Sequence, residues 1–363
     1  MTNLFSPLRL RDLEIPNRIA VSPMCQYSSP NDGLAREWHR VHLGSRAVGG
    51  AGLVMAEATA VEARGRISTH DLGIWSDAHA EALEPVTSFL KSQGSVPAIQ
   101  LAHAGHKASK NQPWEGNVPV PLEDGGWEVL SPSPEAYPFE NEPEEMRRAT
   151  TEDVEAVIDA FCESAKRSLA AGFEVVEVHA AHGYLLHQFL SPVTNRREDD
   201  YGGSFENRTR IVREATAAVR EVWPDDRPVL VRISGTDWLP DRDSWDLEQS
   251  KRLARDLVDL GVDLIDVSSG GVHPDQQAPS GPNYQVPLAE GIDEAVGDDV
   301  AVGAVGGITQ AEQADALVRN ERADLVLVAR EFLRDPYFPL RWADDLGLEG
   351  PEWPVQYRRA VGK

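Results

Sequence analysis

The chain has 363 residues, of which 35 are Lys or Arg and 59 are Asp or Glu, and its formal net charge at pH 7 is −24. With 41% hydrophobic and 26% charged residues, the composition is that of a folded protein and excludes disorder over most of the chain. A surface with this much negative charge repels phosphate backbones and anionic lipid headgroups. We therefore expect no nucleic-acid partner and no membrane partner. No apolar run is long enough to span a bilayer, and the first residues lack the apolar core of a signal peptide, which together predict a cytoplasmic protein.

The basic residues are strongly biased toward arginine, because only six of the 35 are lysines. A surface rich in carboxylates and poor in lysine is typical of halophilic proteins from a salt-rich cytoplasm. GC-biased coding, which also favours arginine, is the alternative explanation. The two cysteines, Cys25 and Cys162, are too few for a disulfide framework or for an iron–sulfur cluster with about four thiolate ligands.

Short runs rich in Val, Ile, Leu and Ala recur along the chain, and longer segments of helical periodicity separate them, as expected of parallel strands that are buried on both faces. Helices are predicted over 151–171, which opens with Thr-Thr-Glu-Asp and stops at Gly172, and over 246–260, which stops at Gly261. The predicted strands cover residues 18–24, 52–60, 96–102, 174–181, 228–235, 264–271, 300–307 and 324–331.

Eight such repeats predict the α/β class and a (β/α)8 TIM barrel, with a single domain over residues 1–363. The alternative is a doubly wound open sheet, which usually has fewer strands and a glycine fingerprint after its first strand. Here the first predicted strand runs instead into Ser22-Pro23-Met24-Cys25. The barrel is therefore favoured.

One connection is too long for an ordinary loop. Residues 103–150 follow the third predicted strand and are rich in Pro, Gly and acidic residues. Because active sites of barrels lie at the C-terminal ends of the strands, this insertion is expected to be a lid or a specificity loop. A mobile surface loop without a role is the alternative.

The C-terminal ends of the predicted strands carry polar residues or glycines, which converge on one mouth in a barrel. Gly306, Gly307 and Arg330 close the last two strands, where barrels commonly bind phosphate, and 269–271 add further backbone amides. A phosphorylated ligand is therefore predicted. The other polar strand ends are Cys25 with Tyr27, Ala58 with Thr59, Gln100 with His103, His179 with His182 and Tyr184, and Arg232.

Two histidines, His179 and His182, are three residues apart at the end of the fourth predicted strand. They could donate two hydrogen bonds to one oxyanion or bind one metal ion. A zinc site needs a third ligand, for which His103, His106 or Glu177 are candidates, but no metal-binding spacing supports one. Tyr184 could donate a proton nearby, whereas His187 and His273 are expected to be structural.

A series of motifs extends over nearly the whole chain. They are Leu4-Phe5-Ser6-Pro7 with Asn17-Arg18, Ser22-Pro23-Met24-Cys25-Gln26-Tyr27, Glu57-Ala58-Thr59, the segments 100–107, 179–192 and 195–208, Val231-Arg232-Ile233-Ser234, Gly306-Gly307-Ile308 and Val328-Ala329-Arg330-Glu331. Through these motifs the chain resembles the old yellow enzyme family of FMN-dependent ene-reductases, in the subgroup called thermophilic-like or class III.

The resemblance implies noncovalently bound FMN as cofactor and NADPH or NADH as reductant. It places Arg232 beside the pyrimidine edge of the flavin, where a cation stabilises the charge of the reduced ring, and Arg330 at the phosphate with amides near Gly271 and Gly307. The residues implied to bind FMN are Ser22, Pro23, Met24, Cys25, Ala58, Gln100, Arg232, Gly271, Gly307, Ala329 and Arg330.

The resemblance also implies catalytic roles. His179 and His182 would bind the carbonyl oxygen of an unsaturated substrate, and Tyr184 would protonate its α-carbon. Tyr27 would close over the substrate, and Cys25 would tune the flavin and contact the substrate without acting as a nucleophile. Reduction of enones, enals, maleimides or nitro compounds follows.

The tail, 351–363, resembles the subgroup's C-terminus, in which an arginine enters the neighbouring subunit's active site. Arg359 fits this role best and Arg358 is the alternative, so a homodimer or homotetramer is expected. Two other functions remain open at this point: a metal-dependent lyase or hydrolase on the same barrel, and a flavin-binding protein without catalysis.

Overall fold

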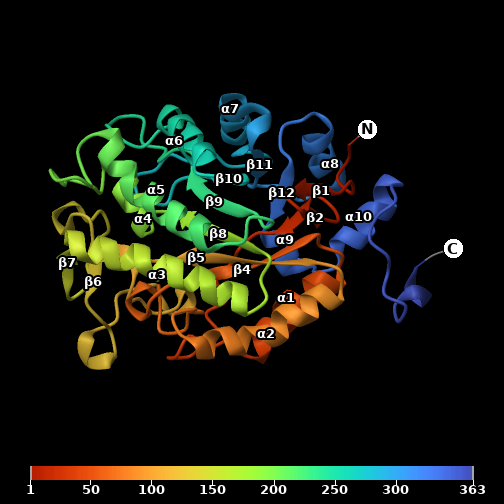
Figure 1. Ribbon diagram of the computed structural model, residues 1–363, viewed down its shortest axis with the longest axis horizontal. Helices are drawn as coiled ribbons and strands as arrows, with labels where there is room; N and C mark the ends of the chain where they lie inside the picture. Colours follow the sequence, from red (N-terminus) through yellow and green to blue (C-terminus); the bar gives the residue numbers. More distant parts are fainter. Residues whose placement is uncertain (1, 362–363) are drawn as a thin grey trace.

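Eight parallel strands close into a barrel in the computed structural model, which describes residues 2–361 (Figure 1). Around the barrel the strands follow chain order, and the last of them pairs with the first through Val326 and Ile19. The barrel strands are β3 (Ile19–Val21), β4 (Leu53–Ala60), β5 (Val96–Ala102), β8 (Val175–Ala180), β9 (Val229–Ser234), β10 (Leu264–Ser268), β11 (Ala301–Ala304) and β12 (Leu325–Val328).

Each of the eight predicted runs contains one of these strands, which confirms the (β/α)8 TIM barrel. Six of the eight observed strands end before their predicted C-terminal residue, whereas β4 and β5 end where predicted, at Ala60 and Ala102. Gly306 and Gly307 adopt φ of 119° and 67°, a conformation that leaves the pleated sheet. The predicted run 300–307 therefore ends as a strand at Ala304 and continues as a loop of the barrel mouth.

Helices cover the outside of the barrel, as the residues between the strands predict. Thr150 caps α3, since its Oγ1 accepts a hydrogen bond from Asp153 N at 3.2 Å. Asp246 caps α6 through Gln249 N at 2.9 Å. The helices are α1 (Glu37–Val48), α2 (Asp77–Ser92), α3 (Thr151–Ala170), α4 (Leu185–Leu190), α5 (Phe205–Val222), α6 (Leu247–Asp259), α7 (Val286–Val296), α8 (Ala311–Arg319), α9 (Arg330–Arg334) and α10 (Phe338–Leu346).

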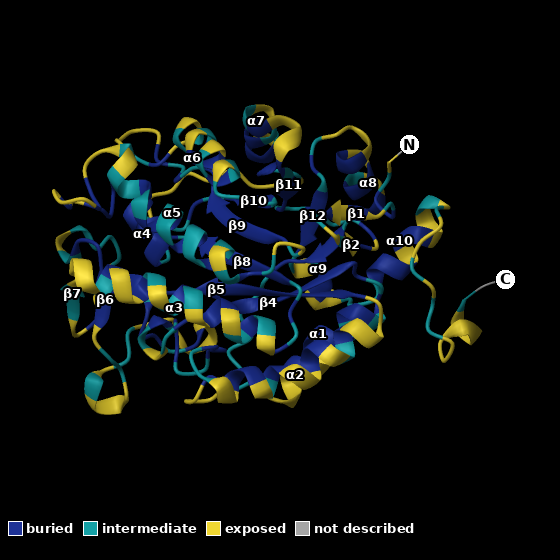
Figure 2. Cartoon of the chain, viewed as in Figure 1, coloured by how far each residue is buried: buried dark blue, intermediate teal, exposed yellow. Residues whose placement is uncertain are grey.

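The N-terminal end of the barrel is closed by an antiparallel hairpin, β1 (Leu8–Leu10) with β2 (Leu13–Ile15). Leu8, Leu10 and Ile15 are buried against the lower interior of the barrel. Figure 2 shows the strands as a buried layer, with exposed residues on the outer faces of the helices. Since this end is plugged, the polar strand ends at the opposite mouth are the place for a ligand.

The insertion 103–150 lies between β5 and α3 and forms short turns and two short parallel strands, β6 (Val129–Ser131) and β7 (Met146–Arg148). It is attached to the barrel body by Trp127, whose Nε1 donates to Arg64 O at 2.9 Å, and by the ion pair of Arg147 with Asp153.

Within residues 2–361 no helix combines the length and the apolarity needed to cross a membrane.

Candidate active site

Arg232 occupies the centre of the barrel interior, near the C-terminal end of β9. Its side chain is buried, its Nη1 donates to Ser22 Oγ at 3.1 Å, and its Nε lies 3.1 Å from Asp266 Oδ2. Ser22 follows β3, and its backbone N donates to Val328 O at 3.0 Å. The structure thus brings the first and the last strand ends to the same arginine, a cation that faces the mouth.

The loop after β3 is held over the mouth by a buried carboxylate. Glu57 Oε2 accepts a hydrogen bond from Gln26 N at 2.6 Å, and Glu57 lies at a bulge, since Ala56 pairs with Ile99 but Ala58 pairs with Gln100. A bulge changes which side chains face inward. Pro23, Met24, Cys25 and Tyr27 in this loop are half-buried, so they line the mouth rather than the core.

His179, His182 and Tyr184 meet at one point of the mouth. The ring of His179 lies 5.2 Å from that of His182 and 5.2 Å from that of Tyr184, each in an edge-on arrangement. Nδ1 of His179 has no hydrogen-bond partner among residues 2–361, whereas His182 Nε2 lies 2.7 Å from Ser268 Oγ. Each imidazole therefore keeps a nitrogen available to a ligand.

The protonation states of this group follow from its surroundings. Burial, and then the charge of Arg232, lower the pKa of both His179 and His182 well below its usual value. Both rings are neutral at pH 7, and each can donate one hydrogen bond. Burial raises the pKa of Tyr184, so its phenol keeps its proton. The group can donate hydrogen bonds to an oxygen and hold a proton next to it.

Cys25 and Tyr27 lie on the other side of the mouth. The thiol of Cys25 hydrogen-bonds to the Tyr27 side chain and to the Ala58 backbone, and burial, with the charges of Asp71 and Glu57, raises its pKa. A thiol with a raised pKa is a poor nucleophile, so the role of Cys25 as a residue that does not attack substrate stays a prediction. The ring of Tyr27 lies 5.7 Å from Trp114 of the insertion.

The glycines predicted at the phosphate site are required by close backbone contacts. Gly271 has φ of 94°, and a Cβ there would lie 2.5 Å from the His182 carbonyl carbon. Gly307 has φ of 67°, and its Cβ would lie 2.3 Å from Gly281 O. Arg330 begins α9 directly after Ala329, is exposed, and forms no ion pair within residues 2–361. An exposed guanidinium that follows β12, next to the strand that leads into Gly307, fits a phosphate group.

Other predicted residues lie apart from this constellation. Arg359 is exposed in the C-terminal tail, and the tail residues Pro351 and Pro354 share a cavity with Asn17 and Ser95 at the N-terminal ends of the barrel strands. Within a single chain, Arg359 therefore does not reach the mouth of the barrel. His187, predicted to be structural, is buried with its Nε2 2.9 Å from Asp237 Oδ1.

The candidate metal ligands do not assemble. His103 Nε2 lies 2.7 Å from Glu62 Oε1, and His106 is buried against the rings of Tyr137 and Phe139 at 5.2 and 6.1 Å. No group of three or more His, Cys, Asp or Glu side chains among the described residues is placed to hold a metal ion.

Sequence reasoning missed three residues that the structure places at the site. Lys107 is anchored between two mouth loops, and Asp266 contacts Arg232. Asp71 is buried, with a pKa raised to about 7 by burial, and lines a narrow cavity with Ala58 and Tyr184. A single charged residue inside an apolar run, as in Leu264-Ile265-Asp266-Val267, is the signal that could have identified Asp266.

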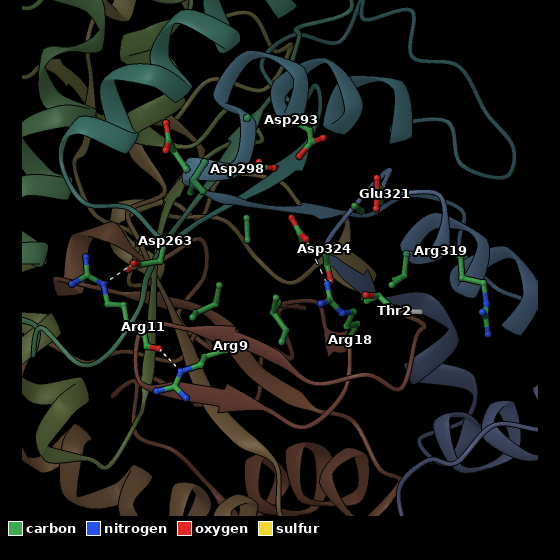
Figure 3. A pocket seen from close by; sticks show the side chains of 18 residues that line it. Thr2, Arg9, Arg11, Arg18, Asp263, Asp293, Asp298, Arg319, Glu321 and Asp324 are labelled. Carbon is green, nitrogen blue, oxygen red and sulfur yellow. Dashed lines mark hydrogen bonds and ion pairs between the residues drawn. The ribbon is translucent and has the colours of Figure 1, made fainter.

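A cavity lies at the opposite end of the barrel (Figure 3). It has a volume of about 840 Å³, and the ion pairs of Arg11 with Asp263 and of Arg18 with Asp324 cross it. None of the predicted site residues lines it. Its charged and open lining differs from that of the mouth, which combines apolar, aromatic and neutral donor groups.

Known proteins resemble this chain over almost its full length. Residues 3–349 match the family model described as the NADH:flavin oxidoreductase / NADH oxidase family. An NADPH dehydrogenase of Geobacillus sp. is 47% identical, over 99% of this chain and 98% of that protein. Morphinone reductase in complex with tetrahydroNAD superposes with a TM-score of 0.77 at 28% identity, over 97% of this chain and 93% of that chain. An old yellow enzyme homologue of Zymomonas mobilis gives 0.78 at 26% identity, over 96% and 94%.

Proposed function

The chain belongs to the NADH:flavin oxidoreductase / NADH oxidase family, and from this premise we propose that it is an ene-reductase. It is an FMN-dependent oxidoreductase of the old yellow enzyme type that uses NADPH or NADH. Its proposed substrates are small molecules with an activated carbon–carbon double bond, such as enones, enals and maleimides, and nitro compounds. The observation that carries this proposal is the convergence of His179, His182 and Tyr184 at the mouth.

FMN is proposed to lie across the mouth, between Arg232 and the histidine pair. Arg232 would face the pyrimidine edge, with the polar groups of Gln100 on β5 and of Ser22 after β3 on the same face of the proposed site. Arg330 and the loops at Gly271 and Gly307 would hold the phosphate. The phosphate of FMN fits here because Arg330 forms no ion pair within residues 2–361, and because the backbone at Gly271 and Gly307 leaves no room for a side chain. The further residues proposed to contact it are Pro23, Met24, Cys25, Ala58 and Ala329.

When bound, FMN supplies a hydride acceptor and donor. His179 and His182 would donate hydrogen bonds to the carbonyl oxygen of the substrate, which withdraws electron density from the double bond and stabilises the developing enolate. Tyr184 would hold a proton for the α-carbon, since burial keeps its phenol protonated. Cys25 and Tyr27 would form the opposite wall of the substrate site.

Kinetics of the oxidative half-reaction test this function. His179→Ala and His182→Ala should each slow reoxidation of the reduced enzyme by 2-cyclohexenone by roughly 10²–10³-fold, since each removes one oxyanion donor. They should also weaken binding of a phenol. His273→Ala, whose ring lies against Asp275 and Arg242 outside the group of His179, His182 and Tyr184, is the matched control and should leave both unchanged. Unchanged enone reoxidation in both site variants would contradict the assignment.

The subunit arrangement is also a proposal. Arg359 lies in a tail at the N-terminal end of its own barrel, so its predicted contact with substrate would have to occur in a neighbouring subunit of a homodimer or homotetramer. Arg359→Ala and Arg358→Ala separate the two candidates. The one that acts should raise KM for an enone without changing FMN content. The insertion 103–150 is proposed to act as the lid, with Trp114 over Tyr27.

A further inference from the structure

Two carboxyl groups lie inside the barrel next to Arg232. Glu177 is on β8 and Asp266 is on β10, so β9 with Arg232 runs between them. Both carboxyl side chains are fully buried at 0% exposure, and Arg232 is 4% exposed. Neither carboxyl has a role in the proposed reaction. Charged groups are rarely this deeply buried unless each is paired.

The contacts of the two carboxyls do not satisfy both as carboxylates. Gln100 Nε2 donates to Glu177 Oε2 at 2.6 Å, but Glu177 Oε1 has no hydrogen-bond partner within residues 2–361. Arg232 Nε lies 3.1 Å from Asp266 Oδ2 without the alignment of a hydrogen bond. The side chains of Asp266 and Glu177 are close enough for a hydrogen bond to each other, which two carboxyls can form only when one of them carries a proton. One guanidinium therefore faces two carboxyls.

The charge balance decides the protonation state. Two buried carboxylates against one cation leave a net negative charge in a water-poor interior, which is costly, whereas one shared proton makes the cluster neutral. Burial raises the pKa of both groups, and the charge of Asp266 raises the pKa of Glu177 further. The remaining polar groups that face the cluster are neutral: Ser22 after β3, Gln100 on β5, and His179, whose pKa is lowered.

We propose that Glu177 and Asp266 share one proton behind Arg232, and take up a second proton when reduction of the bound flavin adds negative charge in front of Arg232. The inference rests on the proposed position of FMN. Glu177 and Asp266 are positioning residues in this scheme, because they act through Arg232 and do not touch substrate. Their function is to keep the charge of the barrel interior balanced in both redox states.

The step balances as follows. NADPH gives a hydride to the flavin and leaves as NADP⁺, and one negative charge is added beside Arg232. One proton from water then binds the carboxyl pair. When substrate takes the hydride, that proton returns to water, and the α-carbon receives a different proton from Tyr184. The protein thus gains one proton on reduction and loses it on reoxidation.

The test measures the midpoint potential of the FMN holoenzyme against pH. Wild-type protein should take up two protons per two electrons around neutral pH, one on the flavin and one on the carboxyl pair. The double variant Glu177→Gln/Asp266→Asn keeps no carboxyl behind Arg232 and should take up one, so its slope of potential against pH is halved. Glu177→Gln alone leaves Asp266 to take up the proton and should keep the wild-type slope, as should Asp259→Asn at an exposed position on α6. An unchanged slope in a double variant that binds FMN would overturn the proposal.

Infrared spectroscopy keeps the test independent of that variant. In wild-type protein with ¹³C-labelled Asp and Glu carboxyls, the reduced-minus-oxidised spectrum should contain a new protonated-carboxyl band, and its absence would overturn the proposal. Flavin-free Asp71→Asn protein, which lacks the other buried carboxyl whose pKa is about 7, should already show one protonated carboxyl at neutral pH. This last measurement separates failure of the carboxyl pair from failure of the proposed function, because it needs neither FMN nor substrate.

Discussion

Lys107 is bonded to the backbone of His182. Its Nζ donates to His182 O at 2.7 Å and also to Gly271 O at 2.6 Å. One amine therefore joins the insertion to the loops after β8 and β10, and it lies 5.2 Å from the Tyr184 ring. Because His182 has φ of 62°, a conformation that is unfavourable for a residue with a side chain, this contact helps to fix the direction of its imidazole.

Replacing Lys107 should loosen the histidine pair without emptying the flavin site. Lys107→Met loses two hydrogen bonds from one amine, at about 1–3 kcal/mol, and should weaken phenol binding by roughly tenfold or more. FMN content should not change. Titration of the flavin absorbance with a phenol measures both. Lys110→Met is the control, since Lys110 also lies over Phe139 but donates to neither carbonyl. Equal losses in the two variants would contradict the anchoring role.

Tyr184→Phe should separate the two half-reactions. In the proposed reaction the phenol is needed only where carbon is protonated, so flavin reduction by NADPH and reoxidation by O₂ should be close to wild type. Reoxidation by an enone should fall by about 10²–10⁴-fold, the usual contribution of a general acid. Stopped-flow absorbance of the flavin measures all three rates. A comparable loss of the O₂ rate would mean that the substitution disturbs the flavin site instead.

Glu62 should contribute stability that depends on pH. Burial works to raise the pKa of Glu62, but hydrogen bonds and charges of His103 and Arg64 outweigh it and lower this pKa to about 2. A carboxyl with a depressed pKa stabilises the fold fully above its unfolded value near 4.5, and loses this contribution as the pH falls toward 2. Glu62→Gln should therefore cost about 1.5–3 kcal/mol at pH 7, and less at pH 3. Urea unfolding at both pH values checks this.

The exposed Glu81, on α2, offers the matched control. Glu81→Gln should change the free energy of unfolding little at either pH. If the Glu62→Gln deficit were the same at pH 7 and pH 3, the stabilisation would come from packing rather than from the ionised carboxylate.

The barrel could be predicted from the sequence because its signal is local. Each strand is a short apolar run, and the caps of α3 and α6 are formed by Thr150 and Asp246 next to the helices they begin. Strand ends were less predictable. Gly306 and Gly307 read as part of a strand, and only their φ values show that the backbone leaves the sheet there.

The grouping of His179, His182 and Tyr184 could be predicted from the sequence, but the contacts around it could not. His179, His182 and Tyr184 are close in sequence, so their meeting at the mouth was expected. The bonds of Lys107 to two separate loops, and the position of Glu177 and Asp266 beside Arg232, join residues that are 75 to 164 positions apart or lie on different strands. Such contacts depend on register around the closed barrel, which no local pattern encodes. The metal interpretation of His103 could not be rejected before its bond to Glu62 was seen.

Salt should stabilise the protein, because its acidic surface includes carboxylates that repel one another at close range. Around the cavity of Figure 3, burial and the charges of Asp324, Asp298 and Glu294 raise the pKa of Asp293. Screening reaches about 10 Å at 0.1 M salt and about 3 Å at 1 M. The melting temperature should therefore rise from 0.05 M to about 2 M KCl, with retention of any oligomer.

Asp293→Asn tests whether the salt effect arises from repulsion between Asp293 and the carboxylates around it. The substitution removes a carboxylate that its neighbours repel, so it should raise the melting temperature in 0.05 M KCl, and the gain should shrink at about 2 M KCl, where salt already screens the repulsion. Asp259→Asn removes the same charge from an exposed position on α6 that does not line this cavity and should give a smaller gain. Melting curves of the three proteins across the salt series decide between the two explanations of the acidic composition. A melting temperature that is flat or falls with KCl would favour coding bias, because a surface adapted to a salt-rich cytoplasm must lose repulsion as its carboxylates are screened.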